Sequence, residues 1–376
     1  MIYLDSAATT LQKPPSVARA MAWAVGHCAS PGRGGYPAAA AAGELAFRCR
    51  ERLAALLGAA GPEQIIFTSS ATHGLNIAIR SLVRPGDRVV LSGYEHNAVT
   101  RTLASIPGAE QAVAMQGLFS PEEDLNAFDR LTRTGAQAVV CTQVSNVFGY
   151  VLPIGEIAGL CRDRGIPLIV DASQSAGILD VDTELWGAAY VALPGHKGLY
   201  GPQGTGVLVC GSGASPLPLL TGGTGSSSRD QSMPPDLPDL LEPGTHNMPG
   251  IAGLCAGAGW VAEQGRGTIL AHERQLSDLL RRALSTMRGV EVIAPERAAL
   301  RTGVLSFRLQ GVDCQEAAQR LGERGICLRA GLHCAPLAHS SAGTLDTGTL
   351  RASFSAFNTR EQVGLLVSAL GDITRK

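Results

Sequence analysis

Lys197 lies in a stretch of sequence whose residue types suit chemistry on a carbonyl compound. It stands between His196 and Gly198 in the Gly- and Pro-rich segment 193–206, directly after the apolar run 188–193. Glycines let the backbone come close to a bound group, and a lysine amine forms a Schiff base with a carbonyl compound. The same pattern is typical of a solvated lysine in a surface turn, so this segment alone leaves both interpretations open.

Polar residues also follow other apolar runs of the chain. Thr72 and Gly74 come after the run 65–67 at the start of a predicted helix, and His96 comes after the run 89–91. A helix N-terminus with small residues can seat a phosphate, although plain N-capping explains the same residues. His96 suits proton transfer over an aromatic ring, or the ordinary role of a satisfied loop histidine.

Two further runs end in polar residues. Asn146 follows the run 138–140, and Asp171 and Gln174 follow the run 168–170. A buried aspartate is costly unless a cationic group meets it. In enzymes that use pyridoxal 5'-phosphate (PLP), an acidic residue meets the protonated pyridine nitrogen, while helix N-capping is the alternative for Asp171. Five polar clusters at successive strand ends favour a single cofactor crevice.

The elements that position these residues alternate between strands and helices. Strands are predicted over 64–68, 88–91, 138–141, 167–170, 190–193 and 206–209, with helices over 38–57, 74–83, 121–132 and 154–164. Strands alternating with helices predict an α/β fold with a mostly parallel, doubly wound sheet.

The second half of the chain predicts a loop and then a smaller α/β domain. Residues 216–249 are rich in Gly, Ser and Pro and predict an ordered functional loop or partner-contact segment. A connecting helix is predicted over 251–264, followed by helices over 269–287, 314–323 and 359–370 and strands over 290–293 and 303–309. We therefore predict a large domain over 15–250, a connecting helix within 251–267, and a small domain from 1–14 and 268–376.

Composition narrows the class of protein. The chain has 376 residues, 45% hydrophobic and 17% charged, with a net charge of −1, which gives no electrostatic case for binding nucleic acid or an anionic membrane. It shows neither a signal peptide nor an apolar run long enough to span a membrane. The nine cysteines form no C-x-x-C pair, so we expect no metal site, no disulfide framework and a cytoplasmic location.

Taken together, the motifs resemble class V aminotransferase-fold PLP enzymes, specifically the cysteine desulfurase and selenocysteine lyase branch. The resemblance rests on segments 3–9, 95–96, 144–146, 170–174 and 195–197, and continues through 329–336 and 350–353. It covers nearly the whole chain in order. It implies PLP-dependent fold type I, with a seven-stranded, mostly parallel sheet in the large domain and a smaller C-terminal α/β domain.

The resemblance also implies a role for each site residue. Lys197 holds PLP and later removes the substrate Cα proton, while His96 stacks on the ring and Asp171 pairs with the pyridine nitrogen. Asn146 lies near cofactor and substrate carboxylate. The remaining implied contacts are Gln174 to the phenolic oxygen, Thr72 and His196 to the phosphate, and Thr245 to the phosphate of the partner subunit in a homodimer. One departure is Pro194, which stands where the family has Ser or Thr and removes a phosphate contact.

Cys334 and Arg351 carry the implied substrate chemistry. Cys334 lies in a predicted exposed, mobile loop, and His333 or Arg329 could supply the positive charge that activates a thiolate. Arg351, by the family pattern, clamps the carboxylate of L-cysteine. The resemblance thus implies a desulfurase that releases L-alanine and leaves a persulfide on Cys334 for an acceptor protein that the sequence does not name.

Two other functions remain open from the sequence. A selenocysteine lyase, or another PLP-dependent lyase or aminotransferase of this fold, shares most of the same residues and differs in its dependence on Cys334. A catalytically silent scaffold or sulfur-carrier regulator is the alternative of another class, against which the intact Lys197 and Asp171 count.

Overall fold

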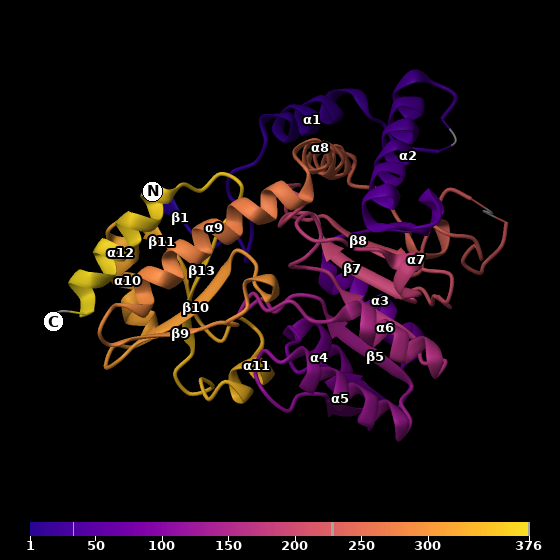
Figure 1. Ribbon diagram of the computed structural model, residues 1–376. Coiled ribbons are helices and arrows are strands. Elements are labelled where there is room, and N and C mark those ends of the chain that lie inside the picture. The colour runs from indigo at the N-terminus through magenta and orange to yellow at the C-terminus, as the bar shows by residue number, and fades with distance from the viewer. Residues whose placement is uncertain (33, 227–228, 375–376) are drawn as a thin grey trace.

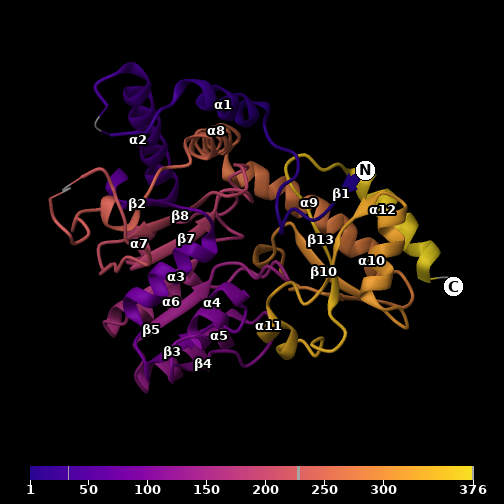
Figure 2. The same ribbon diagram turned by 180° about the vertical axis from the view of Figure 1, so that it is seen from behind.

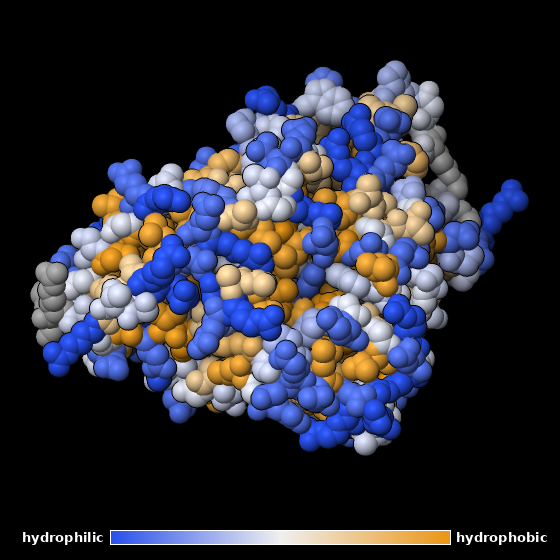
Figure 3. Space-filling view, viewed as in Figure 1, coloured by the Kyte–Doolittle hydropathy of each residue, from blue (hydrophilic) through white to orange (hydrophobic). Residues whose placement is uncertain are grey.

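A computed structural model describes residues 1–32, 34–226 and 229–374. The chain forms two lobes, each built on its own sheet, and the long helix α9 (Arg266–Ser285) runs from the larger lobe into the smaller (Figure 1). Both ends of the chain lie on the smaller lobe. Polar side chains cover much of the periphery of this face, and apolar side chains gather near its middle (Figure 3).

The larger lobe contains the seven-stranded sheet, in the order β2-β8-β7-β6-β5-β3-β4. The pairs joining β7, β6, β5, β3 and β4 are parallel, and β8 is antiparallel to both β7 and β2. The predicted α/β fold with a mostly parallel sheet is therefore confirmed. The strands are β2 (Ile65–Thr68), β3 (Arg88–Leu91), β4 (Glu110–Val113), β5 (Ala138–Thr142), β6 (Leu168–Asp171), β7 (Tyr190–Pro194) and β8 (Gly206–Cys210).

Helices cover both faces of this sheet because its strands are apolar on both sides. Val139 packs into one core cluster and its neighbour Val140 into the other, as the alternation of side chains along a strand requires. The first cluster includes residues of α2 (Pro37–Leu57), α5 (Pro121–Arg133), α6 (Ile154–Asp163), α7 (Thr183–Trp186) and α8 (Met248–Gln264). The second includes residues of α3 (Ala71–Leu82) and α4 (Asn97–Ala104).

The smaller lobe contains a four-stranded antiparallel sheet in the order β12-β13-β10-β9. Its strands are β9 (Val290–Ile293), β10 (Val304–Leu309), β12 (Arg329–Gly331) and β13 (Thr349–Ser353), with helices α10 (Cys314–Glu323), α11 (Pro336–Ser341) and α12 (Arg360–Thr374). Strand β1 (Ile2–Tyr3) pairs with β11 (Ile326–Cys327). Figure 2 shows this N-terminal strand beside the C-terminal elements from behind.

The structure differs from the predicted elements in a few places. Strand β4 was not predicted, because it lies at the sheet edge and buries only Ala112 of its four residues, which leaves no apolar run. Helix α1 (Pro15–His27) was also missed, and it buries only Val17 and Ala24. The described residues of 216–249 form a loop with the short 3-10 helix Asp239–Leu241, and the predicted loop ends inside the first turn of α8. The domain boundaries stay a prediction, and residues 375–376 lie outside the described part.

Candidate active site

A cavity of about 220 Å³ lies at the carboxyl ends of the parallel strands, where the sequence predicted a crevice. Seven of the predicted site residues line it: Thr72, His96, Asn146, Asp171, Gln174, His196 and Lys197. They lie at or after the ends of β3, β5, β6 and β7 and at the start of α3, so the sheet brings together residues that are more than 100 positions apart in sequence. Thr245, Cys334 and Arg351 do not line this cavity.

The loop that carries Lys197 is tightly folded against its neighbours. The Gly195 amide donates to the Thr205 carbonyl at 2.9 Å, and the Tyr200 amide donates to the Lys197 carbonyl at 2.9 Å. A Cβ at Gly195 would lie 2.2 Å from the Thr205 hydroxyl, and one at Gly198 would lie 2.3 Å from the Ala176 carbonyl oxygen. Both glycines are therefore needed because the loop lies close against Thr205 and Ala176 of the same chain, whereas close approach to a bound group stays a prediction. Desolvation lowers the pKa of Lys197 to about 8, and Asp171 opposes part of this shift. A larger fraction of the amine is therefore neutral near neutral pH.

His96 is the N-cap of α4 and faces the cavity as a neutral ring. Its Nδ1 accepts a hydrogen bond from the Ala98 amide at 3.0 Å, so Nε2 carries the proton in the neutral form. Burial lowers the pKa of His96. The preceding Glu95 is fully buried and accepts bonds from the Gly93 amide at 2.7 Å and the Ser92 amide at 3.1 Å, which fixes the turn that presents His96.

Asp171 ends β6, and its carboxylate is held in place rather than free. Oδ1 accepts a hydrogen bond from the Ser173 amide at 2.9 Å, and the residue is buried. Gln174, one turn on, donates from Nε2 to the Ala7 carbonyl oxygen at 2.9 Å. His196 lies next to Lys197, its Nδ1 is buried without a partner among the described residues, and desolvation lowers its pKa to about 4.

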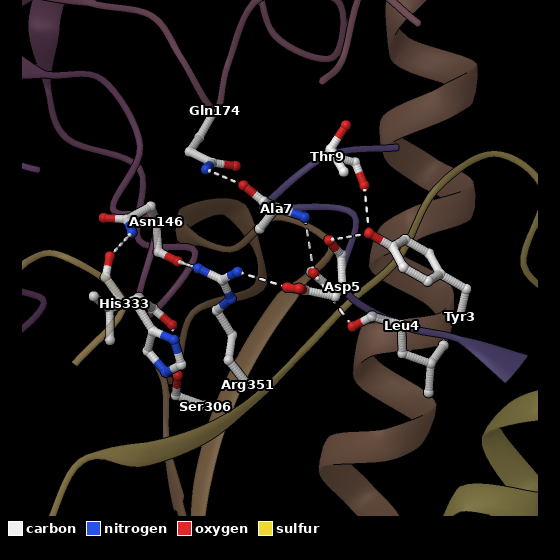
Figure 4. Close-up of polar contacts among 12 residues, drawn as sticks. Tyr3, Leu4, Asp5, Ala7, Thr9, Asn146, Gln174, Ser306, His333 and Arg351 are labelled. Atoms are coloured by element: carbon white, nitrogen blue, oxygen red, sulfur yellow. Dashed lines mark hydrogen bonds and ion pairs between the residues drawn. The ribbon is translucent and has the colours of Figure 1, made fainter. Parts of the chain in front are cut away.

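Arg351 does not line the cavity, and it is connected to it through Asn146. Its Nη1 donates to the Asn146 carbonyl oxygen at 2.9 Å, and its Nη2 pairs with Asp5 Oδ1 at 2.8 Å (Figure 4). The Arg351 residue is 1% exposed, and its Nε has no partner within the described ranges. Strand β13 carries Arg351 into the core.

Cys334 is exposed, and it is the only exposed residue among the nine cysteines, all of which lie in the described ranges. Its backbone is anchored to the large lobe: the Asn97 amide donates to the Cys334 carbonyl at 2.7 Å, and the Asn146 side chain donates to the His333 carbonyl at 2.7 Å (Figure 4). His333 and Cys334 have φ values of 48° and 57°, and such left-handed backbone at non-glycine residues costs about 1–2 kcal/mol each.

One expectation about Cys334 is wrong. His333 was a candidate for the positive charge that activates the thiol, but burial lowers the pKa of His333 to about 2, so the imidazole is neutral. Its Nε2 lies 3.1 Å from the Thr349 hydroxyl, deep in the small lobe. The backbone at His333 is left-handed, and its ring lies beside Thr349 and His339, an orientation that adjacency to Cys334 in sequence does not indicate. Arg329 on β12 stays the candidate cation.

Thr245 and Pro194 need separate comment. Thr245 lines a second cavity of about 300 Å³, together with Ser69 and His73 at the start of α3, and does not face Lys197 of its own chain. Pro194 ends β7 and lines the lysine cavity, so an apolar ring stands where the family has a hydroxyl.

Sequence reasoning missed the part played by the N-terminal segment. Asp5 pairs with Arg351, Ala7 binds Gln174, and Thr10 and Lys13 contact the backbone of the lysine loop. Residues 3–9 were one of the motifs that carry the family resemblance, but a motif does not indicate which side chain faces which partner.

Within the described ranges, no group of three or more potential ligands could hold a metal ion, and no helix is long and apolar enough to span a bilayer.

Comparison with known proteins identifies the family. The class-V aminotransferase family model matches residues 2–366, and the chain belongs to that family. It is similar to a probable cysteine desulfurase of Methanothermobacter thermautotrophicus, at 33% identity over 99% of this chain and 94% of that protein. It is also similar to cysteine desulfurase CsdA of Escherichia coli, at 31% identity over 98% of this chain and 93% of that protein.

Solved structures agree with the sequence relatives. An apo cysteine desulfurase of Thermococcus onnurineus NA1 superposes with a TM-score of 0.89 at 28% identity, covering 100% of this chain and 94% of that chain. The E. coli CsdA structure gives a TM-score of 0.86 at 29% identity, covering 99% and 94%. The fold is therefore that of the PLP-dependent enzymes of fold type I, as the resemblance implied.

The cavity residues of this chain fit PLP, on which the family depends. The N-terminus of α3 points at the cavity through Ala71 and Thr72, and the buried His196 Nδ1 lacks a partner among described residues; both suit a phosphate. Asp171 and Lys197 suit the pyridine nitrogen and the aldehyde.

Proposed function

We propose that this chain is a PLP-dependent cysteine desulfurase that converts L-cysteine to L-alanine and holds the removed sulfur as a persulfide on Cys334. One observation carries the proposal. An exposed thiol sits on strained backbone that is hydrogen-bonded to Asn97 and Asn146, and Asn146 lines the cavity of Lys197. Strain that persists at such a position is stabilised by surrounding contacts and is typical of a functional site. The names of the relatives support the same activity.

The cofactor contacts follow from the cavity. Lys197 would bind PLP covalently, Asp171 would meet the pyridine nitrogen, and His96 would stack on the ring. The remaining contacts are Thr72 and His196 with the phosphate and Gln174 with the phenolic oxygen. When bound, PLP supplies an electron sink that makes the Cα proton of an amino acid acidic.

Arg351 is proposed to bind the carboxylate of L-cysteine. A guanidinium binds a carboxylate with two parallel hydrogen bonds, and Arg351 still has Nε without a partner in the described structure. Asp5 and the Asn146 carbonyl hold the other two nitrogens, so the guanidinium is oriented before the substrate arrives. Asn146 then connects the carboxylate clamp to the Cys334 loop through the His333 carbonyl.

The chemistry that these residues support is a sulfur transfer. Lys197 would be released from PLP when the amine of L-cysteine takes its place, and its pKa, lowered to about 8, would let it remove the Cα proton as a neutral amine. The Cys334 thiolate attacks the substrate sulfur, so an S–S bond forms while the Cβ–S bond breaks. The electron pair of the broken bond stays with the carbon skeleton, which takes up protons and leaves as L-alanine. No external oxidant or reductant is required.

The active form is proposed to be a homodimer in the cytoplasm. Thr245 does not face the lysine cavity of its own chain and lines a separate cavity, which fits a contact with the phosphate held by a partner subunit. The identity of the protein that accepts the sulfur is left open.

The experiment is a desulfurase assay on the PLP-loaded protein, with alanine and persulfide measured separately. Wild type should form alanine and, with a thiol present, sulfide. Cys334→Ser should lose sulfide release from L-cysteine while keeping the visible absorbance of bound PLP, and Cys28→Ser serves as the matched control. Equal desulfuration by the Cys334→Ser variant would refute the assignment. Activity on selenocysteine but not cysteine, without dependence on Cys334, would indicate the lyase alternative.

A further inference from the structure

The N-terminal residues 5–13 pass beside the lysine loop, and several of their polar groups converge on one backbone oxygen. The His196 carbonyl oxygen accepts hydrogen bonds from the Thr10 amide at 3.1 Å, the Thr10 hydroxyl at 3.0 Å and the Thr9 hydroxyl at 3.3 Å. The Lys13 ammonium reaches the same oxygen at 3.0 Å. This oxygen belongs to the peptide that joins His196 to Lys197, so four donors fix the plane of that peptide.

Lys13 contributes to this arrangement in two ways. Its ammonium donates directly to the His196 carbonyl, and it also donates to the Thr10 hydroxyl oxygen at 2.5 Å. Because that oxygen accepts from Lys13, the hydroxyl hydrogen is directed at the lysine loop, where the His196 carbonyl oxygen at 3.0 Å is nearer than the Lys197 carbonyl oxygen at 3.4 Å, and the bonds polarise each other. Lys13 is partly buried, and no ion pair involves it among the described residues. Desolvation lowers its pKa to about 8.

Partial removal of the Lys13 ammonium from water without a carboxylate partner costs free energy. The hydrogen bond that it donates to the His196 carbonyl offsets this cost. Charge-assisted hydrogen bonds are stronger than neutral ones. His196 and Lys197 both line the cavity, whereas Lys13 does not. Lys13 can therefore act on the cavity in two ways, through the peptide that it holds and through its charge, which helps to lower the pKa of His196.

We propose that Lys13 is a positioning residue for the PLP site, which holds the peptide between His196 and Lys197 so that both side chains face the cofactor. This inference rests on the proposed use of PLP. It assigns to Lys13 no contact with substrate or cofactor. Its ammonium lies 3.0 Å from the carbonyl oxygen of His196, the residue that precedes Lys197.

The test compares Lys13→Met, which removes both the charge and the donors, with Lys13→Arg, which keeps them. Arg19→Met, at an exposed position of α1, is the matched control. We expect Lys13→Met to release PLP about tenfold faster than wild type or more, the loss expected for a hydrogen bond to a charged group. The pH midpoint of the PLP absorbance should rise, because a nearby positive charge has been removed. In kinetics kcat should fall more than KM rises, Lys13→Arg should recover most of the loss, and Arg19→Met should match wild type.

A second readout needs neither PLP nor substrate. The chain has only three lysines, Lys13, Lys197 and Lys376, so labelling of Lys197 by an amine reagent can be followed by peptide mass spectrometry. In the PLP-free protein, Lys13→Met should change the labelling rate of Lys197, and Thr10→Val should change it in the same direction. Unchanged PLP release, absorbance midpoint and labelling in Lys13→Met would overturn the inference. If Lys13→Met does not fold, a wild-type result for Thr10→Val would overturn it instead. A wild type that binds no PLP would refute the proposed function, independently of the labelling result.

Discussion

The ion pair between Asp5 and Arg351 gives a quantitative test of the site. The two side chains are 19% and 2% exposed and lie 2.8 Å apart, and Arg351 is otherwise satisfied only by the Asn146 carbonyl among described groups. Two unit charges about 4 Å apart interact by about 4 kcal/mol at an effective dielectric constant of about 20. Asp5→Asn removes this attraction but keeps an acceptor oxygen, which restores about 1 kcal/mol. The expected loss in the free energy of unfolding is therefore about 2–3 kcal/mol.

A double-mutant cycle isolates this pair from other effects of the substitution. Urea unfolding of the PLP-free protein should give Asp5→Asn the loss above in the wild-type background. In an Arg351→Met background the same substitution should cost close to nothing, because no buried guanidinium is left without a partner. The coupling energy should then be about 2–3 kcal/mol. A coupling energy below about 0.5 kcal/mol would refute the view that Asp5 holds Arg351 in place for the substrate.

Two further predictions concern buried acids outside the cavity. Glu242 is buried and accepts hydrogen bonds from Arg50 at 2.6 and 2.9 Å and from His246 at 2.6 Å. The substitution Glu242→Gln should therefore lower the free energy of unfolding by about 3 kcal/mol or more. Urea unfolding measures this loss, with Glu44→Gln at an exposed position as the control, and a loss equal to that of the control would contradict the prediction. Glu273 is buried beside Tyr200, and burial raises its pKa to about 8. Its folded pKa therefore exceeds its unfolded value of about 4.3, so its contribution to stability is full below the unfolded pKa and is lost as pH rises through about 8. Glu273→Gln should flatten the fall in stability between about pH 5 and 8, and an unchanged pH profile would show that Glu273 is not neutral in the folded protein.

The central sheet and the cavity were largely predictable from the sequence, for a physical reason. Parallel strands covered on both faces are short apolar runs, and each ends at the same edge of the sheet, so polar residues that follow them meet. His96, Asp171 and Lys197 were found in this way and line one cavity. The edge strand β4 was not found, because a strand with one buried side chain lacks that signal.

The contacts of the N-terminal segment could not be predicted, since they join residues at least 167 positions apart. Nothing in the types or spacing of Asp5 and Lys13 indicates that one pairs with Arg351 and the other with the His196 carbonyl. The orientation of His333 is a related case, because the side to which it turns depends on the local φ of 48°. Long-range pairing and local backbone twist are properties of the folded chain, and neither leaves a periodic pattern.

The most direct test of the proposed function is mass spectrometry of the Cys334 peptide after the PLP-loaded protein has reacted with L-cysteine and been alkylated without reductant. We predict that the Cys334 peptide gains the mass of one sulfur atom in proportion to the alanine formed, and that the other eight cysteines do not. Alanine formation without added sulfur on Cys334, or with the sulfur on another cysteine, would contradict the account.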